Sequence, residues 1–241
     1  MKTHLIMIPA HNEEGNIATV LEDVLSLDLG TDILVINDGS SDQTENIVKS
    51  YPVFLVTHPV NLGYAATLQT GFKFAYNKGY QYVIQLDGDG QHDVQYIHEL
   101  MYALSNEQTD IVLGSRFLQR SQMNISWAKL AVIKFFRAMI MRMTGKKVTD
   151  PTSGFRGYKV SVFHNFVKPN FFPNEYPDSN LIIELLLQKY RLVEVPVNMK
   201  DRMHGVSMHA GFKSFIYMFH VMLSIVTVML RHTLRKRVSI K

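Results

Sequence analysis

Asp87 and Asp89 are two carboxylates separated by one glycine, and they directly follow an apolar run that ends at Leu86. Two carboxylates this close repel each other unless a positive charge lies between them, and a hard divalent cation with oxygen ligands meets that need. Gln91 offers a third side-chain oxygen two residues later. The spacing therefore predicts a divalent-cation site, and the structural alternative is a pair of turn-forming aspartates that face water.

The residues on either side of this pair predict where it lies. Residues 82–86 are typical of a strand buried on both faces, and Gly88 and Gly90 allow the chain to turn sharply after it. Open α/β sheets bind ligands at the carboxyl ends of their strands. Polar turns at 9–14 and 37–42 follow two further predicted strands, so we expect three such turns on one edge of the sheet.

Alternating strands and helices predict the rest of the fold. Apolar positions three and four residues apart predict helices packed on the sheet, for example over 17–25. Asn12 is the predicted N-cap of that helix, with two glutamates in its first turn, and Asp42 with Glu45 resembles a capping box for the next helix. The alternation predicts βαβ units, right-handed crossovers and a parallel sheet. The predicted strands of this sheet are residues 4–8, 33–36, 53–57, 82–86 and 110–114.

Composition favours one domain that buries a single core. The chain has 241 residues, of which 46% are hydrophobic, and its net charge of +4 is too small by itself to indicate a nucleic-acid partner. Zero cysteines exclude disulfides and thiolate metal sites, which fits a reducing compartment. The opening residues lack the pattern of a signal peptide, so we expect a cytoplasmic protein.

The positive charge is unevenly distributed along the chain. Six basic residues and no acidic residue fall within 129–147, and no carboxylate side chain follows residue 202. Such an asymmetry predicts a surface that faces an anionic partner.

Five segments occur in an order and spacing that a known family shares. These segments are residues 9–14, 38–44, 61–63, 87–92 and 114–116. With them the chain resembles the family 2 glycosyltransferases of the GT-A fold, and most closely their dolichyl-phosphate-mannose-synthase-like members. The resemblance implies an α/β, Rossmann-like, mostly parallel sheet flanked by helices. It also implies a nucleotide-sugar donor, a divalent cation (Mg²⁺ or Mn²⁺) on the Asp-x-Asp motif, and inversion at the anomeric carbon.

Three later segments match the same family. Residues 150–156 are similar to the segment that shapes its acceptor side, 192–197 to a late strand, and 202–207 to a mobile Arg-x-x-Gly-x-Ser loop. The chain departs from the family's usual residues at His11 (a tyrosine), Val94 (a proline) and Met208 (a lysine or serine).

The resemblance places the donor along the predicted edge of the sheet. Asp38 would accept hydrogen bonds from the base or the ribose, and Glu13 from ribose hydroxyls. Helix capping, which Asn12 and Glu13 can do, is the structural alternative. Arg202 would close over the diphosphate where charge develops, and a solvated loop arginine is its alternative. Asp89 and Arg202 are the predicted catalytic residues, and Asp87, Asp89 and Gln91 the predicted metal ligands. The predicted donor-binding residues are Pro9, His11, Asn12, Glu13, Asp38, Asp87, Gly88 and Asp89.

The acceptor decides whether the reaction needs a general base. A polyprenyl phosphate, of undecaprenyl or dolichyl type, is already an anion and needs positive charge around it. Arg116 and Arg156 are predicted to supply that charge, with Ser207 as a further contact. A glycan hydroxyl instead needs a carboxylate to remove its proton, and Asp178 stands near the position where hydroxyl-transferring relatives hold their base. Capping of the following helix is the structural alternative for Asp178.

Two apolar segments predict contact with a membrane surface. Residues 214–230 contain no charged side chain, and the polar residues of this region fall on one helical stripe, as in a helix that lies in a membrane interface. Residues 127–143 are a second candidate, and packing in the core or between copies of the chain is the alternative for both. We expect a catalytic domain over 1–211, including a basic apolar helical segment at 125–147, and an amphipathic helix with a basic tail over 212–241.

The sequence thus predicts an inverting, metal-dependent glycosyltransferase that acts on a polyprenyl phosphate while peripherally bound to the cytoplasmic face of the membrane. One rival is a transferase to a glycan hydroxyl in cell-surface polysaccharide synthesis. The other is a catalytically inactive scaffold that binds sugar nucleotides. A nucleotidyltransferase is disfavoured, because residues 9–12 replace the glycine-rich opening expected after its first strand.

Overall fold

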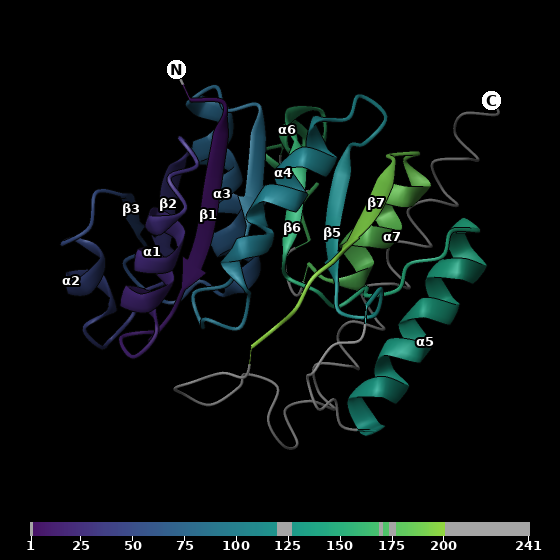
Figure 1. The fold of residues 1–241 in the computed structure, drawn as a ribbon, viewed down its shortest axis with the longest axis horizontal. Coiled ribbons are helices and arrows are strands. Elements are labelled where there is room, and N and C mark those ends of the chain that lie inside the picture. Colours follow the sequence, from purple (N-terminus) through teal and green to yellow (C-terminus); the bar gives the residue numbers. More distant parts are fainter. Residues whose placement is uncertain (1, 120–126, 169–170, 174–176, 201–241) are drawn as a thin grey trace.

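The computed structural model describes residues 2–119, 127–168, 171–173 and 177–200, with only the main chain of 127–129 (Figure 1). This part of the chain forms one seven-stranded sheet covered by helices on both faces. Its strands are β1 (His4–Ala10), β2 (Asp32–Asn37), β3 (Phe54–Thr57), β4 (Tyr82–Gln85), β5 (Ile111–Ser115), β6 (Arg156–Lys159) and β7 (Leu192–Pro196). Its helices are α1 (Ile17–Ser26), α2 (Thr44–Val48), α3 (Tyr64–Asn77), the single 3₁₀ turn η1 (Val94–Tyr96), α4 (Ile97–Ser105), α5 (Trp127–Thr144), α6 (Val160–Phe166) and α7 (Ser179–Leu187).

The strand order is β3-β2-β1-β4-β6-β5-β7, and every neighbouring pair is parallel except the two pairs that involve β6. The predicted α/β, mostly parallel sheet is therefore confirmed. The antiparallel strand β6 was not predicted, because its four residues, Arg-Gly-Tyr-Lys, carry no apolar run or alternation. Inserted between β4 and β5, it places Arg156 beside Gln85 at the end of β4.

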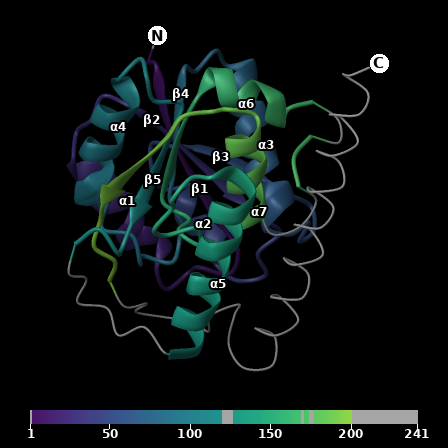
Figure 2. The ribbon, with the colours of Figure 1, turned by 90° about the vertical axis from the view of Figure 1, so that its right-hand side faces the viewer.

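Alternation along β1 explains the two layers of helices. Successive side chains of a strand point to opposite faces, so Ile6 and Ile8 pack with α1 and α4 whereas Leu5 and Met7 pack with α3 and α6. Figure 2 shows these layers on either side of the sheet. Both faces of β1 and β2 are buried, as expected for parallel strands.

Two helix starts differ from the prediction. Helix α1 begins at Ile17 and has no acidic residue in its first turn, so Asn12 is not its N-cap and the two glutamates do not lie in that turn. Asn12 instead adopts a left-handed backbone conformation, with φ of 54°. Helix α2 begins at Thr44, and Asp42 accepts hydrogen bonds from the main-chain nitrogen and hydroxyl of Thr44 without the predicted capping box.

Helix α5 lies outside the two main layers and packs on α7 through a small third core of Leu113, Phe136, Ile140 and Ile183 with their neighbours. Along the described part of the chain, no helix is both long and apolar enough to cross a bilayer. The predicted amphipathic helix over 212–241 lies outside the described residues.

Candidate functional site

Asp87 lies at the turn after β4, at the carboxyl edge of the sheet, and two hydrogen bonds hold its carboxylate. The Tyr64 hydroxyl donates to Oδ1 at 2.9 Å, and Nε2 of His92 donates to Oδ2 at 3.1 Å. Nε2 of Gln85 in turn donates to the Tyr64 oxygen at 2.9 Å. Burial alone would raise the pKa of Asp87, but the bonds from His92 and Tyr64 and the positive charge of Arg156 lower it. The carboxylate is therefore kept ionised and fixed in orientation.

Gly154 packs directly against this carboxylate. A Cβ atom built on Gly154 would lie 2.6 Å from Oδ2 of Asp87, which is closer than real contacts allow. Residues 150–156, predicted from the resemblance to shape the acceptor side, thus approach the aspartate pair with their main chain. Only glycine at 154 permits this approach.

Asp89 and Gln91 complete the predicted cation site. The main-chain nitrogen of Gln91 donates to Oδ1 of Asp89 at 3.1 Å. The main-chain nitrogen of Lys200 donates to the Gln91 carbonyl at 2.8 Å. Among the described residues, no group of three or more His, Cys, Asp or Glu side chains is placed to hold a metal ion. Two carboxylates and one amide form an all-oxygen set, which suits Mg²⁺ or Mn²⁺ when a ligand's phosphates and water complete the shell. The residues present therefore fit such an ion.

Asp38 lies at the turn after β2 and connects that turn to the loop before α3. Its Oδ1 accepts from Nδ1 of His58 at 2.8 Å and from the Leu62 nitrogen at 2.9 Å, and its Oδ2 accepts from the Gly63 nitrogen at 2.9 Å. Burial alone would raise the pKa of Asp38, but the bond from His58 and these two main-chain bonds lower it. Asp38 is thus ionised and holds residues 61–63 in place. The predicted contact from Asp38 to a base or ribose stays a prediction.

His11 and Asn12 join the turn after β1 to the same region. Nδ1 of His11 lies 2.7 Å from the Asp38 carbonyl oxygen, and its Nε2 lies 3.0 Å from Nδ2 of Asn61. The main-chain nitrogen of Ser41 donates to Oδ1 of Asn12 at 2.8 Å, across the turn after β2. The polar turns after β1, β2 and β4 therefore meet on one edge of the sheet, as the sequence predicted.

The same edge of the sheet also includes Pro9, Gly88 and Glu13. The Gly88 nitrogen donates to the Pro9 carbonyl at 3.3 Å, which ties the turn after β4 to the end of β1. Glu13 is 9% exposed, and Oε2 of Glu13 accepts from Nδ2 of Asn16 at 2.7 Å. Contacts of these residues with a donor stay predictions.

Arg116 follows β5 and forms a buried two-bond ion pair with Asp150. Its Nε lies 2.6 Å from Oδ2 and its Nη2 2.7 Å from Oδ1 of Asp150, and Nη2 also donates to the Thr152 hydroxyl at 2.9 Å. Arg116 is 4% exposed. Since Nε and Nη2 are already bonded, Arg116 anchors the 150–156 segment, and its predicted contact with an acceptor phosphate stays a prediction.

Arg156 on β6 is buried beneath the site. Its Nε donates to the Ser153 carbonyl at 2.7 Å and its Nη1 to the Pro177 carbonyl at 2.9 Å, while Nη2 lies 3.7 Å from Oδ1 of Asp178. Burial alone would lower the pKa of Arg156, but Tyr158 and the Asp178 carboxylate raise it. Arg156 is thus a charged group, 2% exposed, that braces the main chain around the site, and its predicted contact with an acceptor phosphate stays a prediction.

Asp178 precedes α7 but does not cap it with its side chain. Asp178 thus occupies the N-cap position that the capping alternative expected, but without a side-chain capping bond, and its carboxylate faces Arg156. Arg202 and Ser207 lie outside the described residues.

Sequence reasoning missed several residues that build the site. Tyr64 was not predicted because it begins an apolar helical pattern, where a tyrosine is ordinarily core. Asp150 and His58 were missed because their partners Arg116 and Asp38 lie 34 and 20 residues away in the chain. His92 ends the 87–92 segment named in the sequence, and its bond to Asp87 is a contact within that segment.

Comparisons with known proteins agree with this architecture. A model of Glycosyl transferase family 2 matches residues 5–166. The chain is 30% identical over 213 residues to an uncharacterized protein of Methanocaldococcus jannaschii, which covers 84% of this chain and 90% of that protein. It is 26% identical over 225 residues to the polyprenol monophosphomannose synthase of Mycolicibacterium smegmatis, which covers 90% of this chain and 84% of the synthase.

A solved structure shows the same fold. The glucosyl-3-phosphoglycerate synthase of Mycobacterium tuberculosis, crystallised with Mn²⁺, UDP and glucosyl-3-phosphoglycerate, superposes with a TM-score of 0.69 at 17% identity. The match covers 96% of this chain and 80% of that chain.

Proposed function

This chain belongs to glycosyl transferase family 2, and from that premise we propose that it transfers a sugar, with inversion, from a nucleotide-diphosphate donor to a polyprenyl phosphate. The observation that carries the proposal is the Asp87 and Asp89 pair at the carboxyl edge of the sheet, with Asp87 held ionised by Tyr64 and His92. The relative named polyprenol monophosphomannose synthase, which spans 90% of this chain, supports the choice of acceptor.

Asp87, Asp89 and Gln91 would hold a divalent cation in this proposal. When bound, the cation supplies positive charge to the leaving diphosphate. Tyr64 and His92 would keep the Asp87 carboxylate oriented toward the donor, and the main chain of Gly154 packs against it.

The turns after β1 and β2 would bind the nucleoside. His11 bridges Asp38 and Asn61, so a base placed here meets a preformed surface, with Pro9 and Glu13 beside it. Residues already fixed by their neighbours lose little conformational entropy when a ligand binds. We propose Arg202 as a second positive charge that closes over the diphosphate, with Asn12 and Gly88 as further donor contacts.

The acceptor phosphate needs positive charge around it. Arg116 and Arg156 are committed to Asp150 and to the main chain near Asp178, so we propose that they position the acceptor-side segment and do not touch the phosphate. Ser207 remains a proposed contact. Lys134 and Arg142, two exposed basic residues of α5, are better placed than Arg116 and Arg156 to attract an anion from solution.

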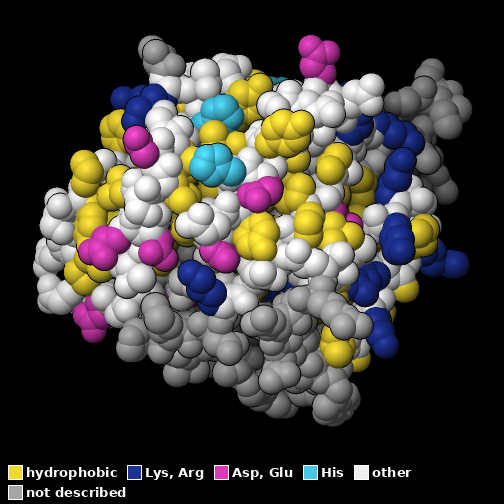
Figure 3. Space-filling view, in the orientation of Figure 1, with side chains coloured by type: hydrophobic (Ala, Val, Ile, Leu, Met, Phe, Trp, Pro, Cys, Tyr) yellow, Lys and Arg dark blue, Asp and Glu magenta, His cyan; other side chains and the backbone are white. Residues whose placement is uncertain are grey.

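Helix α5 would bring the site to a membrane surface. The exposed residues of α5 recur every three or four positions, so they form one stripe. That stripe includes Phe135 at 44% and Met141 at 45% exposure. Figure 3 shows Lys and Arg side chains along the right-hand edge of the molecule, where Figure 1 places α5. Apolar and basic side chains on one face suit the cytoplasmic face of a bilayer that contains anionic lipids. The stripe consists of Ala131, Lys134, Phe135, Ala138, Met141 and Arg142.

The test is transfer of radiolabelled sugar from a panel of nucleotide sugars to a polyprenyl phosphate in vesicles, by the full chain. We expect transfer from one donor, abolished by a chelator and restored by Mg²⁺ or Mn²⁺. No transfer from any donor would contradict the proposed reaction. Transfer that persists in chelator would contradict the cation site alone.

A second acceptor class has an observation in its favour. The Asp178 side chain does not cap α7, and its carboxylate lies 3.7 Å from the buried guanidinium of Arg156, in a position where it could remove a proton from a glycan hydroxyl. Asp178→Asn separates the two classes. Transfer to a phosphate should survive the change, because that acceptor is already an anion, whereas transfer to a hydroxyl should fall by about a hundredfold or more.

A further inference from the structure

A pocket of about 330 Å³ lies at the edge of the sheet opposite the candidate site. One wall is formed at the end of α5 and just after it, by Thr144, Lys146, Lys147 and Val148. The other runs from the end of α7 to the start of β7 and is formed by Leu186, Lys189, Tyr190, Arg191 and Leu192. Leu192 pairs with Ile111 at the start of β5, whereas Ser115 at the end of β5 leads to Arg116. The length of β5, about 13 Å at 3.3 Å per residue, therefore separates the pocket from the acceptor-side segment.

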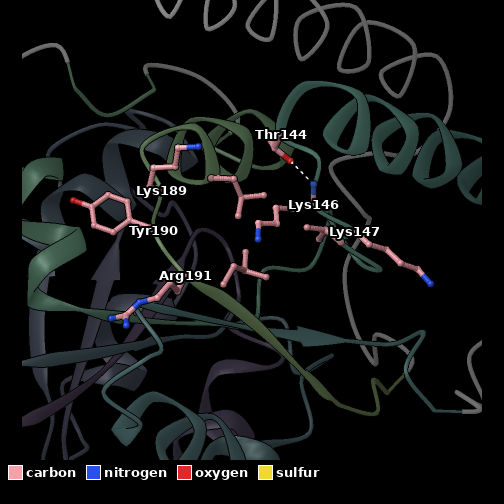
Figure 4. Close-up of a pocket in the computed structure, with 9 residues that line it drawn as sticks. Thr144, Lys146, Lys147, Lys189, Tyr190 and Arg191 are labelled. Atoms are coloured by element: carbon pink, nitrogen blue, oxygen red, sulfur yellow. Dashed lines mark hydrogen bonds between the residues drawn. The ribbon is translucent and has the colours of Figure 1, made fainter.

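The pocket has an apolar floor and basic walls. Val148, Leu186 and Leu192 supply the floor, and no carboxylate side chain lines the pocket. Figure 4 shows Lys146 and Lys147 on one side and Lys189, Tyr190 and Arg191 on the other, with Lys147 extending away from the remaining lining residues.

Arg191 and Tyr190 are already committed to other partners. The Arg191 guanidinium makes two bonds to the Asp110 carboxylate, at 3.0 and 3.1 Å. The Tyr190 hydroxyl donates to the Ser161 carbonyl and accepts from Nδ2 of Asn165. By contrast, within the described chain the ammonium groups of Lys146, Lys147 and Lys189 pair with no carboxylate.

The C-terminal ends of α5 and α7 offer a structural explanation for part of this charge. Each helix C-terminus carries about half a negative charge, so the two ends together offset about one lysine. The carbonyl end of α7 is also partly satisfied, because the nitrogens of Lys189 and Tyr190 donate to Leu186 and Leu185. Because Lys147 extends away, Lys146 and Lys189 are the lysines that face the pocket, and a net positive charge of about one remains for a ligand after the helix ends are offset.

The backbone of Lys189 supports this reading. Its φ is 70°, in the left-handed region that favours glycine at the end of a helix. A lysine at this position carries a conformational cost that glycine would avoid, and strain of this kind concentrates at functional sites.

We propose that this pocket binds a phosphate group, through Lys146 and Lys189 from its two walls, at a site separate from the donor and acceptor sites. The apolar floor accommodates a short hydrocarbon portion of the molecule that bears the phosphate. Two sources share this chemistry: a soluble phosphate compound and the headgroup of an anionic phospholipid. The inference does not depend on the sugar-transfer proposal, since it uses none of the residues of that site.

The test compares the full-length chain with two double variants of equal charge. Lys146→Gln with Lys189→Gly removes one ammonium from each wall, and the glycine suits the backbone at 189, so the fold should be retained or slightly stabilised. Lys49→Gln with Lys73→Gln removes two exposed lysines elsewhere, from the end of α2 and from α3. Inorganic phosphate is titrated by calorimetry at constant ionic strength in one arm. Vesicles of phosphatidylcholine, with or without phosphatidic acid, are used for flotation in the other.

We expect phosphate binding by the parent chain and the control variant, and binding at least about tenfold weaker in the pocket variant. If only flotation with phosphatidic acid separates the pocket variant from the control, the proposal holds and the lipid headgroup is the source. A pocket variant that matches the control in both arms overturns the proposal. Circular dichroism and thermal melting of all three proteins confirm that they are equally folded.

Discussion

Gly154 lies so close to Asp87 that any side chain at 154 would collide with the carboxylate: a Cβ atom there would be 2.6 Å from Oδ2. The contact joins two parts of the chain that the sequence presents separately. One is the turn after β4, and the other is the segment that Arg116 anchors through Asp150. The position of the Asp87 carboxylate therefore depends on the main chain of a residue that lies 67 positions later in the sequence.

Gly154→Ala should lower kcat/KM by about tenfold to a hundredfold, because displacement of a catalytic group by about 1 Å costs this much. The matched control is Gly79→Ala. Gly79 has φ of 80° and no neighbour within 4 Å of a built Cβ, so its replacement should cost stability, by about 1–2 kcal/mol, and leave activity unchanged. Equal activity in the two variants would contradict the importance of the Asp87 contact. Steady-state kinetics and urea unfolding give both quantities.

Asp89→Asn should reduce transfer by about a hundredfold or more and weaken Mn²⁺ binding, since an amide is a poorer ligand for a hard cation than a carboxylate. Calorimetric titration of Mn²⁺ in the presence of the nucleoside diphosphate measures the affinity. Asp23→Asn, a change in α1 away from the site, is the control and should bind Mn²⁺ like the parent chain. Undiminished Mn²⁺ binding by Asp89→Asn would exclude Asp89 as a ligand.

Tyr64→Phe removes a hydroxyl that donates to Asp87 and accepts from Gln85. We expect kcat to fall about tenfold while the KM for the acceptor stays unchanged. The free energy of unfolding should fall by about 1–3 kcal/mol, because the buried Gln85 amide loses its acceptor. Tyr51→Phe, which deletes a surface bond to Glu22, should change neither quantity and is the control. A Tyr64→Phe enzyme with parental kcat would show that the hydroxyl does not position Asp87.

Asp38 should make stability depend on pH in the acid range. Its pKa is lowered in the folded chain, despite burial, by bonds from His58, Leu62 and Gly63. A carboxyl group of this kind stabilises the folded state fully above its unfolded pKa, about 3.9, and the contribution is lost as pH falls through the lower folded value. We expect Asp38→Asn to be less stable than the parent by about 1–3 kcal/mol at pH 7.

The same two proteins should approach each other in stability as pH falls below about 4. Urea unfolding across that range measures the difference. A gap between parent and variant that stays constant as pH falls would contradict the ionised, hydrogen-bonded state of Asp38.

Arg116→Met should cost about 3–5 kcal/mol of stability, because it leaves the buried Asp150 carboxylate without its partner. Denaturant unfolding measures this loss. If Arg116 instead bound the acceptor phosphate directly, the variant would remain stable and the KM for the acceptor would rise. The double variant Arg116→Met, Asp150→Leu removes both charges and should recover most of the lost stability.

Much of the fold could be predicted because it follows from local patterns. The apolar runs of β1, β2, β4 and β5 and the polar turns that end them are visible in the sequence, and the structure places those turns on one edge. Strand β6 could not be predicted, since it has four residues without alternation and forms only between two partners already in place.

The candidate site was less predictable, because its contacts join distant residues. Arg116 and Arg156 were predicted as charges for an acceptor phosphate, and only the folded chain brings Asp150 and Asp178 to them. The N-cap prediction for Asn12 was wrong for a related reason. Ser41 and His11 bond to the Asn12 side chain, and this tertiary contact outweighs the local preference for a cap.

The antiparallel insertion of β6 has a consequence for the order in which the chain can assemble during synthesis. Residues 1–90 contain every strand and turn of the nucleoside side, and they can associate as soon as they emerge from the ribosome. Gly154, which packs against Asp87, reaches its place only when β6 pairs with β4. The strand β6 follows β4 by about 70 residues, and Ile84 pairs with Gly157 there. The half that would grip the nucleotide is thus built from early, nearby contacts, and the half that would govern the acceptor is the last to be secured.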